Sequence, residues 1–251
     1  MDPICFHIGS RPIYWYGVMM ALAFLAGIGH WHWLGRRTGR DVSLSGDLAF
    51  WLMAGGILGA RLAYVIANLD YYRAAPQEII RIDQGGLIFY GGFIGGLLTF
   101  FAFARWRRIQ PLDLADFTVT ALPLGHALGR IGCFLNGCCG GGAVPHPSFL
   151  TCGLTHYPVQ LYETVFNLGV YMLLTWFFLF RRNGRRGSVV ALYLMTYPIG
   201  RFLLEFIRGD ARMHFGRLDM AQVISLGLIG MGLALWWFAR QNRTRGHYES
   251  V

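Results

Sequence analysis

The chain alternates between long apolar stretches and short polar connections. A helix needs about 20 mostly apolar residues to cross the hydrocarbon core of a bilayer. Seven stretches are candidates, at roughly 13–34, 47–68, 87–104, 113–129, 159–180, 188–207 and 218–239. This pattern predicts an all-α polytopic membrane protein with seven transmembrane helices. The fourth stretch is short and continues directly into a segment rich in glycine and cysteine.

Arginines predict the orientation of these helices. Thirteen of the 22 basic residues form four clusters, each following the first, third, fifth or seventh stretch: Arg36, Arg37, Arg40; Arg105, Arg107, Arg108; Arg181, Arg182, Arg185, Arg186; Arg240, Arg243, Arg245. Cytoplasmic loops carry such an excess of positive charge. We therefore expect the N-terminus outside, the C-terminus in the cytoplasm, and two external links, at about 69–86 and 131–157. The second link would form a small external cap. The first stretch lacks the flanks of a signal peptide, so we expect it to be retained.

The composition supports this picture. Hydrophobic residues make up 55% of the chain and charged residues 14%, whereas soluble domains carry about 25% charged residues. The formal net charge of +9 does not indicate nucleic-acid binding, because most of the arginines lie at the ends of apolar stretches. No internal repeat or soluble domain is visible, so residues 1–251 are expected to form a single integral membrane domain.

Four predicted helices carry polar side chains at helical spacing. These polar faces are Arg61, Tyr64 and Asn68; His126 and Arg130; Gln160, Glu163 and Asn167; and Tyr197, Arg201, Glu205 and Arg208. An arginine at the centre of a membrane helix costs about 2.5–3.5 kcal/mol. One interpretation is that these groups pair with each other between helices, as Arg201 and Glu205 would. Pairing explains less of the pattern if Arg61, Arg130 and Arg208 have no partner, as the sequence suggests.

Convergent arginines suit an anionic ligand, because guanidinium groups bind phosphate in a bidentate fork. The abundant anion of a bilayer is the phospholipid headgroup. The residues alone therefore predict a protein that holds a phospholipid phosphate within the outer half of the membrane. They leave open whether it is an enzyme, a transporter or a scaffold.

Cysteines and glycines both gather in particular places. Five cysteines fall on the predicted outer side: Cys5, Cys133, Cys138, Cys139 and Cys152. An external location permits disulfides, and Cys152 with Cys138 or Cys139 is one option. Because the spacing does not match a paired C-x-x-C zinc motif, we expect structural thiols or one disulfide, and no metal. In the third stretch and just before it, glycines are expected to allow close helix approach: Gly85, Gly86, Gly91, Gly92, Gly95 and Gly96.

The segment GRIGCFLNGCCGG at 129–141 resembles the signature of the prolipoprotein diacylglyceryl transferase family, Gly-Arg-x-Gly-Asn-Phe-x-Asn-x-Glu-x-x-Gly. Six positions match, namely Gly129, Arg130, Gly132, Phe134, Asn136 and Gly141, while Cys133 and Cys138 replace Asn and Glu. Five further pieces are similar in family order: WYG at 15–17, GARLAYV at 59–65, GGLIFYGGFIGG at 85–96, HYPVQLYE at 156–163 and RFLLEFIRGD at 201–210.

This resemblance implies a transferase of lipoprotein biogenesis in the bacterial cytoplasmic (inner) membrane. The family moves the diacylglyceryl group of phosphatidylglycerol to the lipobox cysteine of a prolipoprotein signal peptide, forming a thioether and releasing glycerol 1-phosphate. No metal, soluble cofactor or nucleic acid is implied. The nucleophile is the thiol of the substrate.

The resemblance also implies roles for individual residues. Arg130 and Arg201 are the expected catalytic residues, since fixed guanidinium groups would stabilise the charge that develops on the departing phosphate. The expected substrate-binding residues are Arg61, Asn136, Gly141, Glu163, Glu205 and Arg208, together with three tyrosines, Tyr16, Tyr64 and Tyr197. The alternative for these tyrosines is that they are ordinary aromatic residues of the membrane interface.

The identity of the general base is open. Tyr90-Gly91-Gly92 stands where much of the family has His-Gly-Gly. A tyrosine has a reference pKa of about 10 and a histidine one of about 6.5, so Tyr90 is a poor base at neutral pH. We expect His126, one turn before Arg130, to take the proton, with Tyr90 as the other candidate. The structural alternative is that His126 only hydrogen-bonds a neighbouring helix.

Two rival hypotheses remain. A phospholipid or small-anion transporter predicts repeats in matching halves, and none is visible. A paralogue with a different acceptor is supported only by the departures at Tyr90, Cys133 and Cys138.

Overall fold

The computed structural model describes residues 3–41, 43–81, 85–144, 146, 151–180, 185–209, 214–215 and 218–241. The chain forms two compact units. Unit 1 comprises Met1–Trp31 and Ala115–Val251, and unit 2 comprises His32–Leu114. Helix α1 (Trp15–Thr38) begins in the first unit and ends in the second.

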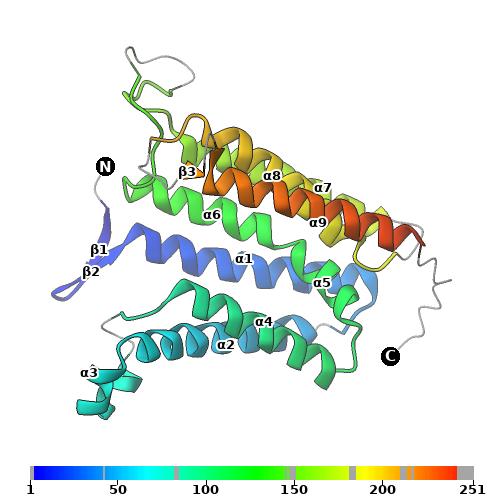
Figure 1. The fold of residues 1–251 in the computed structure, drawn as a ribbon, viewed down its shortest axis with the longest axis horizontal. Helices are drawn as coiled ribbons and strands as arrows, with labels where there is room; N and C mark the ends of the chain where they lie inside the picture. The colour runs from blue at the N-terminus through cyan, green and yellow to red at the C-terminus, as the bar shows by residue number, and fades with distance from the viewer. Residues whose placement is uncertain are drawn as a thin grey trace. The chain divides into compact units, whose positions relative to one another are not determined.

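Unit 1 is mainly helical. A hairpin of β1 (Ile4–Ile8) and β2 (Arg11–Tyr14) leads into α1. The other elements are the end of α5 (Pro111–Val119), α6 (Leu122–Leu135), α7 (Val159–Phe180), α8 (Ser188–Glu205), the two-residue strands β3 (His214–Phe215) and β4 (Leu218–Asp219), and α9 (Met220–Gln241). Helix α6 packs on α7, α7 on α8, and α8 on α9 (Figure 1).

Glycines let the helices of unit 1 approach closely. The ring of Phe166 on α7 occupies the space that a Cβ at Gly200 of α8 would need. A Cβ at Gly132 of α6 would lie 3.0 Å from the Cβ of Met19 on α1. These contacts fix the rotation of α6 and α8, the two helices that carry Arg130 and Arg201.

A buried carboxylate anchors the start of α8. Asp116 of α5 has an exposed fraction of 0%. Its oxygens accept hydrogen bonds of 2.9 to 3.0 Å from the first backbone N–H groups of that helix, those of Gly187, Val189 and Val190. The first N–H groups of a helix have no partner within it, and a negative charge is favourable there. Asp116 therefore acts as an N-terminal cap supplied by a distant segment.

Unit 2 consists of α2 (Ser43–Ala67), α3 (Leu69–Ala74), the 3-10 helix η1 (Pro76–Ile80) and α4 (Phe89–Trp106), besides the end of α1 and the start of α5. Helices α2 and α4 pack along each other (Figure 1). A Cβ at Gly59 would collide with the carbonyl oxygen of Gly91, and one at Gly95 with that of Gly55. The expected close approach is confirmed for Gly91, Gly92 and Gly95. Gly86 lies against side chains of α2, whereas Gly85 and Gly96 face open space.

The end of α4 is tied to the chain that enters α2. Arg107 lies 3.4 Å from a carboxylate oxygen of Asp41 and 3.5 Å from one of Asp47. Hydrogen bonds from the hydroxyl and the N–H of Ser43 lower the pKa of the Asp41 carboxyl from its ordinary value, and Arg107 adds to that effect.

All seven predicted stretches are helical, with one correction. The fourth is broken at Thr120 and Ala121 into α5 and α6. Pro123, in the first turn of α6, lacks an N–H and disfavours a continuous helix through this point.

Among the described residues, four helices are long and apolar enough to cross a membrane: α1, α2, α7 and α9. Large apolar side chains also point outward, including Leu58 (70% exposed), Leu98 (66%) and Val165 (71%). A soluble monomer rarely exposes so much apolar surface. The mainly helical fold is therefore consistent with a polytopic membrane protein.

Candidate active site

Five charged side chains gather at one end of the helices of unit 1. Arg130 comes from α6, Glu163 from the first turns of α7, and Arg201 and Glu205 from α8, while Arg208 follows α8 directly. We call this set the charged cluster. Three of the four polar faces expected from the sequence contribute to it.

Glu163 is the shared acceptor of the charged cluster. It is 3% exposed. The Nε of Arg130 forms an ion pair with its Oε2, and the Nη1 of Arg208 lies 3.4 Å from its Oε1. The expectation that Arg130 and Arg208 have no partner was wrong, because the acceptor lies on another helix and helical spacing does not reveal it.

The second ion pair of the charged cluster lies within α8. Arg201 Nη1 donates to Oε2 of Glu205, which confirms the pairing expected from their spacing. The side chains of Arg130 and Arg201 keep exposures of 17% and 15%, whereas Glu205 is 4% exposed as a residue. Among the described residues, the charged cluster holds three guanidinium groups and two carboxylates. Arg130 and Arg201 are its partly exposed cations.

Two aromatic rings lie beside the charged cluster. The ring of His126 lies 5.2 Å from that of Tyr197, which stacks in turn on Tyr193 at 5.4 Å. His126 is within electrostatic range of Arg130 and Arg201, and Tyr197 also of Glu163 and Arg208. The structure thus brings His126 and Tyr197 to the catalytic arginines predicted from sequence.

The end of α6 turns through a Schellman motif. Asn136 is the C-cap, and Gly137 follows at a φ of 70°. The N–H of Cys138 bonds to the carbonyl of Cys133 at 3.1 Å, and that of Gly137 to Phe134 at 3.1 Å. The glycine is needed because this left-handed conformation penalises a Cβ. Arg130 therefore lies about one and a half turns before a sharply defined helix end.

Gly141 fixes the backbone beside Arg208. Its N–H bonds to the carbonyl of Tyr157 at 2.8 Å, the N–H of Gly142 bonds to Ile207 at 3.0 Å, and Gly141 forms a β-bridge with Arg208. A Cβ on Gly141 would lie 2.6 Å from the Cβ of Tyr157. Gly141 thus positions backbone and leaves no room for a side chain.

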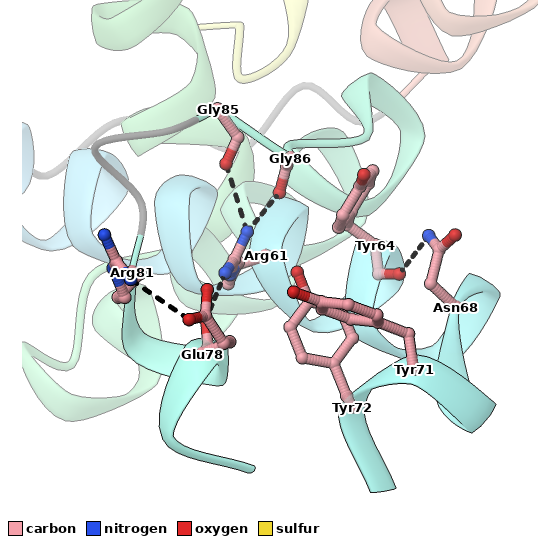
Figure 2. A pocket seen from close by; sticks show the side chains of 9 residues that line it. All are labelled: Arg61, Tyr64, Asn68, Tyr71, Tyr72, Glu78, Arg81, Gly85 and Gly86. Carbon is pink, nitrogen blue, oxygen red and sulfur yellow. Dashed lines mark hydrogen bonds and ion pairs between the residues drawn. The ribbon is translucent and has the colours of Figure 1, made fainter. Parts of the chain in front are cut away.

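Unit 2 contains a separate pocket, shown in Figure 2, with a volume of about 340 Å³. It is lined by Arg61, Tyr64, Asn68, Tyr71, Tyr72, Glu78, Arg81, Gly85 and Gly86. Two predicted substrate-binding residues, Arg61 and Tyr64, lie here. Asn68, on the same predicted face, donates to the carbonyl of Tyr64 at 2.9 Å.

Arg61 is 8% exposed and has backbone partners, which corrects the expectation that it is unpaired. It donates at 2.6 to 3.1 Å to four carbonyl groups, those of Glu78, Ile79, Gly85 and Gly86. The rings of Tyr64 and Tyr72 flank its guanidinium at 5.8 and 5.3 Å. Arg61 therefore joins η1 to the chain that enters α4.

The remaining predicted positions are more exposed. Tyr90, in the first turn of α4, is 75% exposed. Tyr16, at the start of α1, is 44% exposed and within electrostatic range of Arg130 and of Cys133, Cys138 and Cys139. Sequence reasoning missed the role of Asp116, although an acidic residue in an apolar stretch was a usable signal.

All five cysteines lie in the described part of the chain and are free thiols. The open option of a Cys152 disulfide is thus not realised in this structure. The sulfur atoms of Cys133, Cys138 and Cys139 lie within 4.8 Å of one another, a convergence that sequence spacing did not predict.

Apolar helices and a largely buried cluster of arginines and glutamates are typical of a helical membrane protein with a polar site inside it. Residues 3–238 match the family model for prolipoprotein diacylglyceryl transferase. Proteins named phosphatidylglycerol--prolipoprotein diacylglyceryl transferase are similar over nearly the full length. The protein of Clostridioides difficile (strain 630) is 35% identical over 250 residues, 97% of this chain and 98% of the relative. That of Clostridium novyi (strain NT) is 35% identical over 246 residues, 94% and 95%. That of Bacillus cytotoxicus is 36% identical over 247 residues, 91% and 88%. The chain belongs to the prolipoprotein diacylglyceryl transferase family.

Proposed function

We propose that this protein transfers the diacylglyceryl group of phosphatidylglycerol to the lipobox cysteine of prolipoproteins. The sulfur of that cysteine attacks the carbon of the diacylglyceryl group that is bonded to the phosphate oxygen. A carbon–sulfur bond forms, the carbon–oxygen bond breaks, and glycerol 1-phosphate leaves. The observation that carries the proposal is the charged cluster of a chain in this family, in which the guanidinium groups of Arg130 and Arg201 are partly exposed.

The arginines fit the change of charge during this reaction. The phosphodiester of the lipid carries one negative charge, and the departing phosphate monoester approaches two. Arg130 and Arg201 are partly exposed, so each guanidinium can direct donors towards a phosphate. Glu163 holds the orientation of Arg130, and Glu205 holds that of Arg201. Donors fixed in advance stabilise developing charge without reorganisation. Arg208, Tyr197 and Glu205 would complete the headgroup site, and Asn136 and Gly141 would shape its outer edge.

His126 is the proposed general base. It lies beside Tyr197 and in range of both catalytic arginines, as a base near the phosphate must. Tyr90 belongs to unit 2 and remains the alternative. Arg61 and Tyr64, which line the pocket of unit 2, and Tyr16, at the start of α1, are the other proposed substrate-binding residues.

The proposed membrane topology follows from the positions of the four arginine clusters. We propose seven spans, with α5 and α6 together as the fourth, an external N-terminus and a cytoplasmic C-terminus in the bacterial cytoplasmic membrane. Residues 131–157 would form the external cap, and residues 1–251 a single integral membrane domain. The apolar outward side chains of α4, including Leu98, support a lipid-facing position for this shorter helix.

Mass spectrometry tests the activity directly. Purified protein is incubated with phosphatidylglycerol and a model prolipoprotein, and the mass of the lipobox peptide is measured. We expect a diacylglyceryl increment on its cysteine and free glycerol phosphate in equal amount. The matched control is the peptide with its lipobox cysteine replaced by serine, which should stay unmodified. Movement of lipid without any increment on the peptide would point to the transporter instead.

A further inference from the structure

Three sulfur atoms converge at the end of α6. The Schellman motif brings Cys133, at its C3 position, against Cys138, at C″, because side chains at these two positions usually touch. The sulfur of Cys138 also lies 3.6 Å from the carbonyl oxygen of Cys133. The helix cap thus explains why the sulfurs of Cys133 and Cys138 are neighbours.

The third sulfur does not follow from the helix cap. Cys139 has a φ of 64°, a left-handed conformation that a residue with a Cβ rarely adopts. This conformation curls the chain back, and all three sulfurs lie within 4.8 Å of one another. Two of the three residues are half-buried and Cys139 is exposed, so an ion from solvent has access from one side.

This spacing is close to that of a metal–thiolate centre. With metal–sulfur bonds of about 2.3 Å, three thiolates around one ion sit roughly 3.8–4.0 Å apart. The sulfurs therefore need shifts of less than about 1 Å to share an ion. Within the described residues no histidine or carboxylate joins the group. Three sulfurs alone favour a soft ion that accepts three thiolates, whereas structural zinc almost always has four protein ligands.

We propose that Cys133, Cys138 and Cys139 form a binding site for a soft thiophilic cation, with Cu⁺ as the best match. Three thiols bind one Cu⁺ and release three protons to solvent, so the loaded centre carries two negative charges. Arg130 and Arg208, which are in electrostatic range of Cys139, offset that charge. Binding of this ion does not require the transferase activity proposed above, although Arg130 and Arg208 lie close to both sites.

The test is a copper titration of the full-length protein in detergent, reduced and kept free of oxygen. Cu⁺ is supplied from a chromophoric chelator that competes for the ion, and bound copper is counted per chain. The matched control is a double variant, Cys5→Ser with Cys152→Ser, which keeps the three clustered thiols. We expect about one Cu⁺ per chain in the wild type and in this control. The triple variant Cys133→Ser, Cys138→Ser, Cys139→Ser should bind none.

Two further measurements keep the result interpretable. The single variant Cys139→Ser leaves the helix cap intact, so it should fold even if the triple variant does not, and it should lose the copper to the chelator. Zn²⁺ in the same titration should bind more weakly than Cu⁺, because one ligand is missing. Retention of copper by Cys139→Ser, or failure of the wild type to take copper from the chelator, would overturn the proposal.

Discussion

Glu163 binds two arginines from different parts of the chain, Arg130 on α6 and Arg208 after α8. A buried carboxylate with a single cationic partner would lose all its compensation when that partner is removed, and such losses are strongly destabilising. Here Arg208 remains when Arg130 is removed. Loss of Arg130 should therefore affect chemistry more than folding.

Arg130→Ala and Arg201→Ala should each lower the transfer rate by about 100-fold or more, the cost of removing one oxyanion donor. Arg130→Lys should recover part of this loss, since it restores the charge but not the planar fork. The assay is the peptide-modification rate at equal protein levels in membranes. Arg73→Ala is the control, because its pair with Asp70 is exposed and such pairs contribute little. Near-normal transfer by Arg130→Ala would contradict a phosphate-binding role.

His126 lies beside Tyr197, near the proposed phosphate site, and we expect it to take the proton of the substrate thiol. The substrate thiol has a reference pKa of about 8.5. Most of it is therefore protonated at neutral pH and must lose its proton before the sulfur can attack. His126→Ala should slow transfer by about 10²–10⁴-fold at neutral pH, the usual worth of a general base. The deficit should shrink above about pH 9, where the thiol ionises without help. The measurement is a pH–rate profile.

Tyr90→Phe is the comparison for His126→Ala. It removes one hydroxyl from an exposed ring and should reduce the rate less. A nearly silent His126→Ala together with an inactive Tyr90→Phe would reverse the two roles.

At the level of elements, α8 depends on a residue outside it. Asp116 accepts hydrogen bonds from the N–H groups of Gly187, Val189 and Val190, and it is completely buried. Its removal leaves the first turn of α8 unsatisfied. The same helix positions Arg201 and Glu205.

Asp116→Ala should lower the free energy of unfolding by about 1–3 kcal/mol, the range for a lost N-cap or an unsatisfied buried group. Asp116→Asn should cost less, since one oxygen can still accept. The measurement is equilibrium unfolding in micelles. Asp70→Ala is the matched control, because its carboxylate is fully exposed, and its effect should stay within about 0.5 kcal/mol. Equal stability of Asp116→Ala and Asp70→Ala would contradict the capping role.

The sequence predicted the helices better than it predicted which side chains contact one another. Apolar length located the long helices, because an apolar run of that length favours a helix. The short helices α3 and η1 lie in a segment that was predicted as a link. The break at Thr120 was also visible in Pro123, but apolar length outweighed it. The acceptors of Arg61 could not be foreseen, because they are backbone carbonyls and carry no signal of residue type. The cysteine cluster depends on the left-handed φ of Cys139, which residue spacing does not encode.

For the whole molecule, orientation is the main prediction. Cys152 is exposed and free, so a membrane-impermeant thiol reagent can report its side. With the other four cysteines replaced by serine, Cys152 should be labelled in cells with an intact cytoplasmic membrane. Thr38→Cys, at the end of α1, should be labelled only after permeabilisation when Cys152 is also replaced. The opposite labelling pattern would show that the chain has the inverse orientation in the membrane.

The bridge between Gly141 and Arg208 has a consequence for how two substrates communicate. Residues 141 and 142 bond on one side to Tyr157 and on the other to Ile207. Under the proposed function, a phosphate held by Arg208 restrains the same backbone that organises the external cap. Occupancy by the lipid and ordering of the cap are then linked, and thermodynamic linkage is reciprocal. Each substrate should change the affinity of the enzyme for the other by the same factor, so that the lipid becomes an effector of peptide binding as well as a reactant.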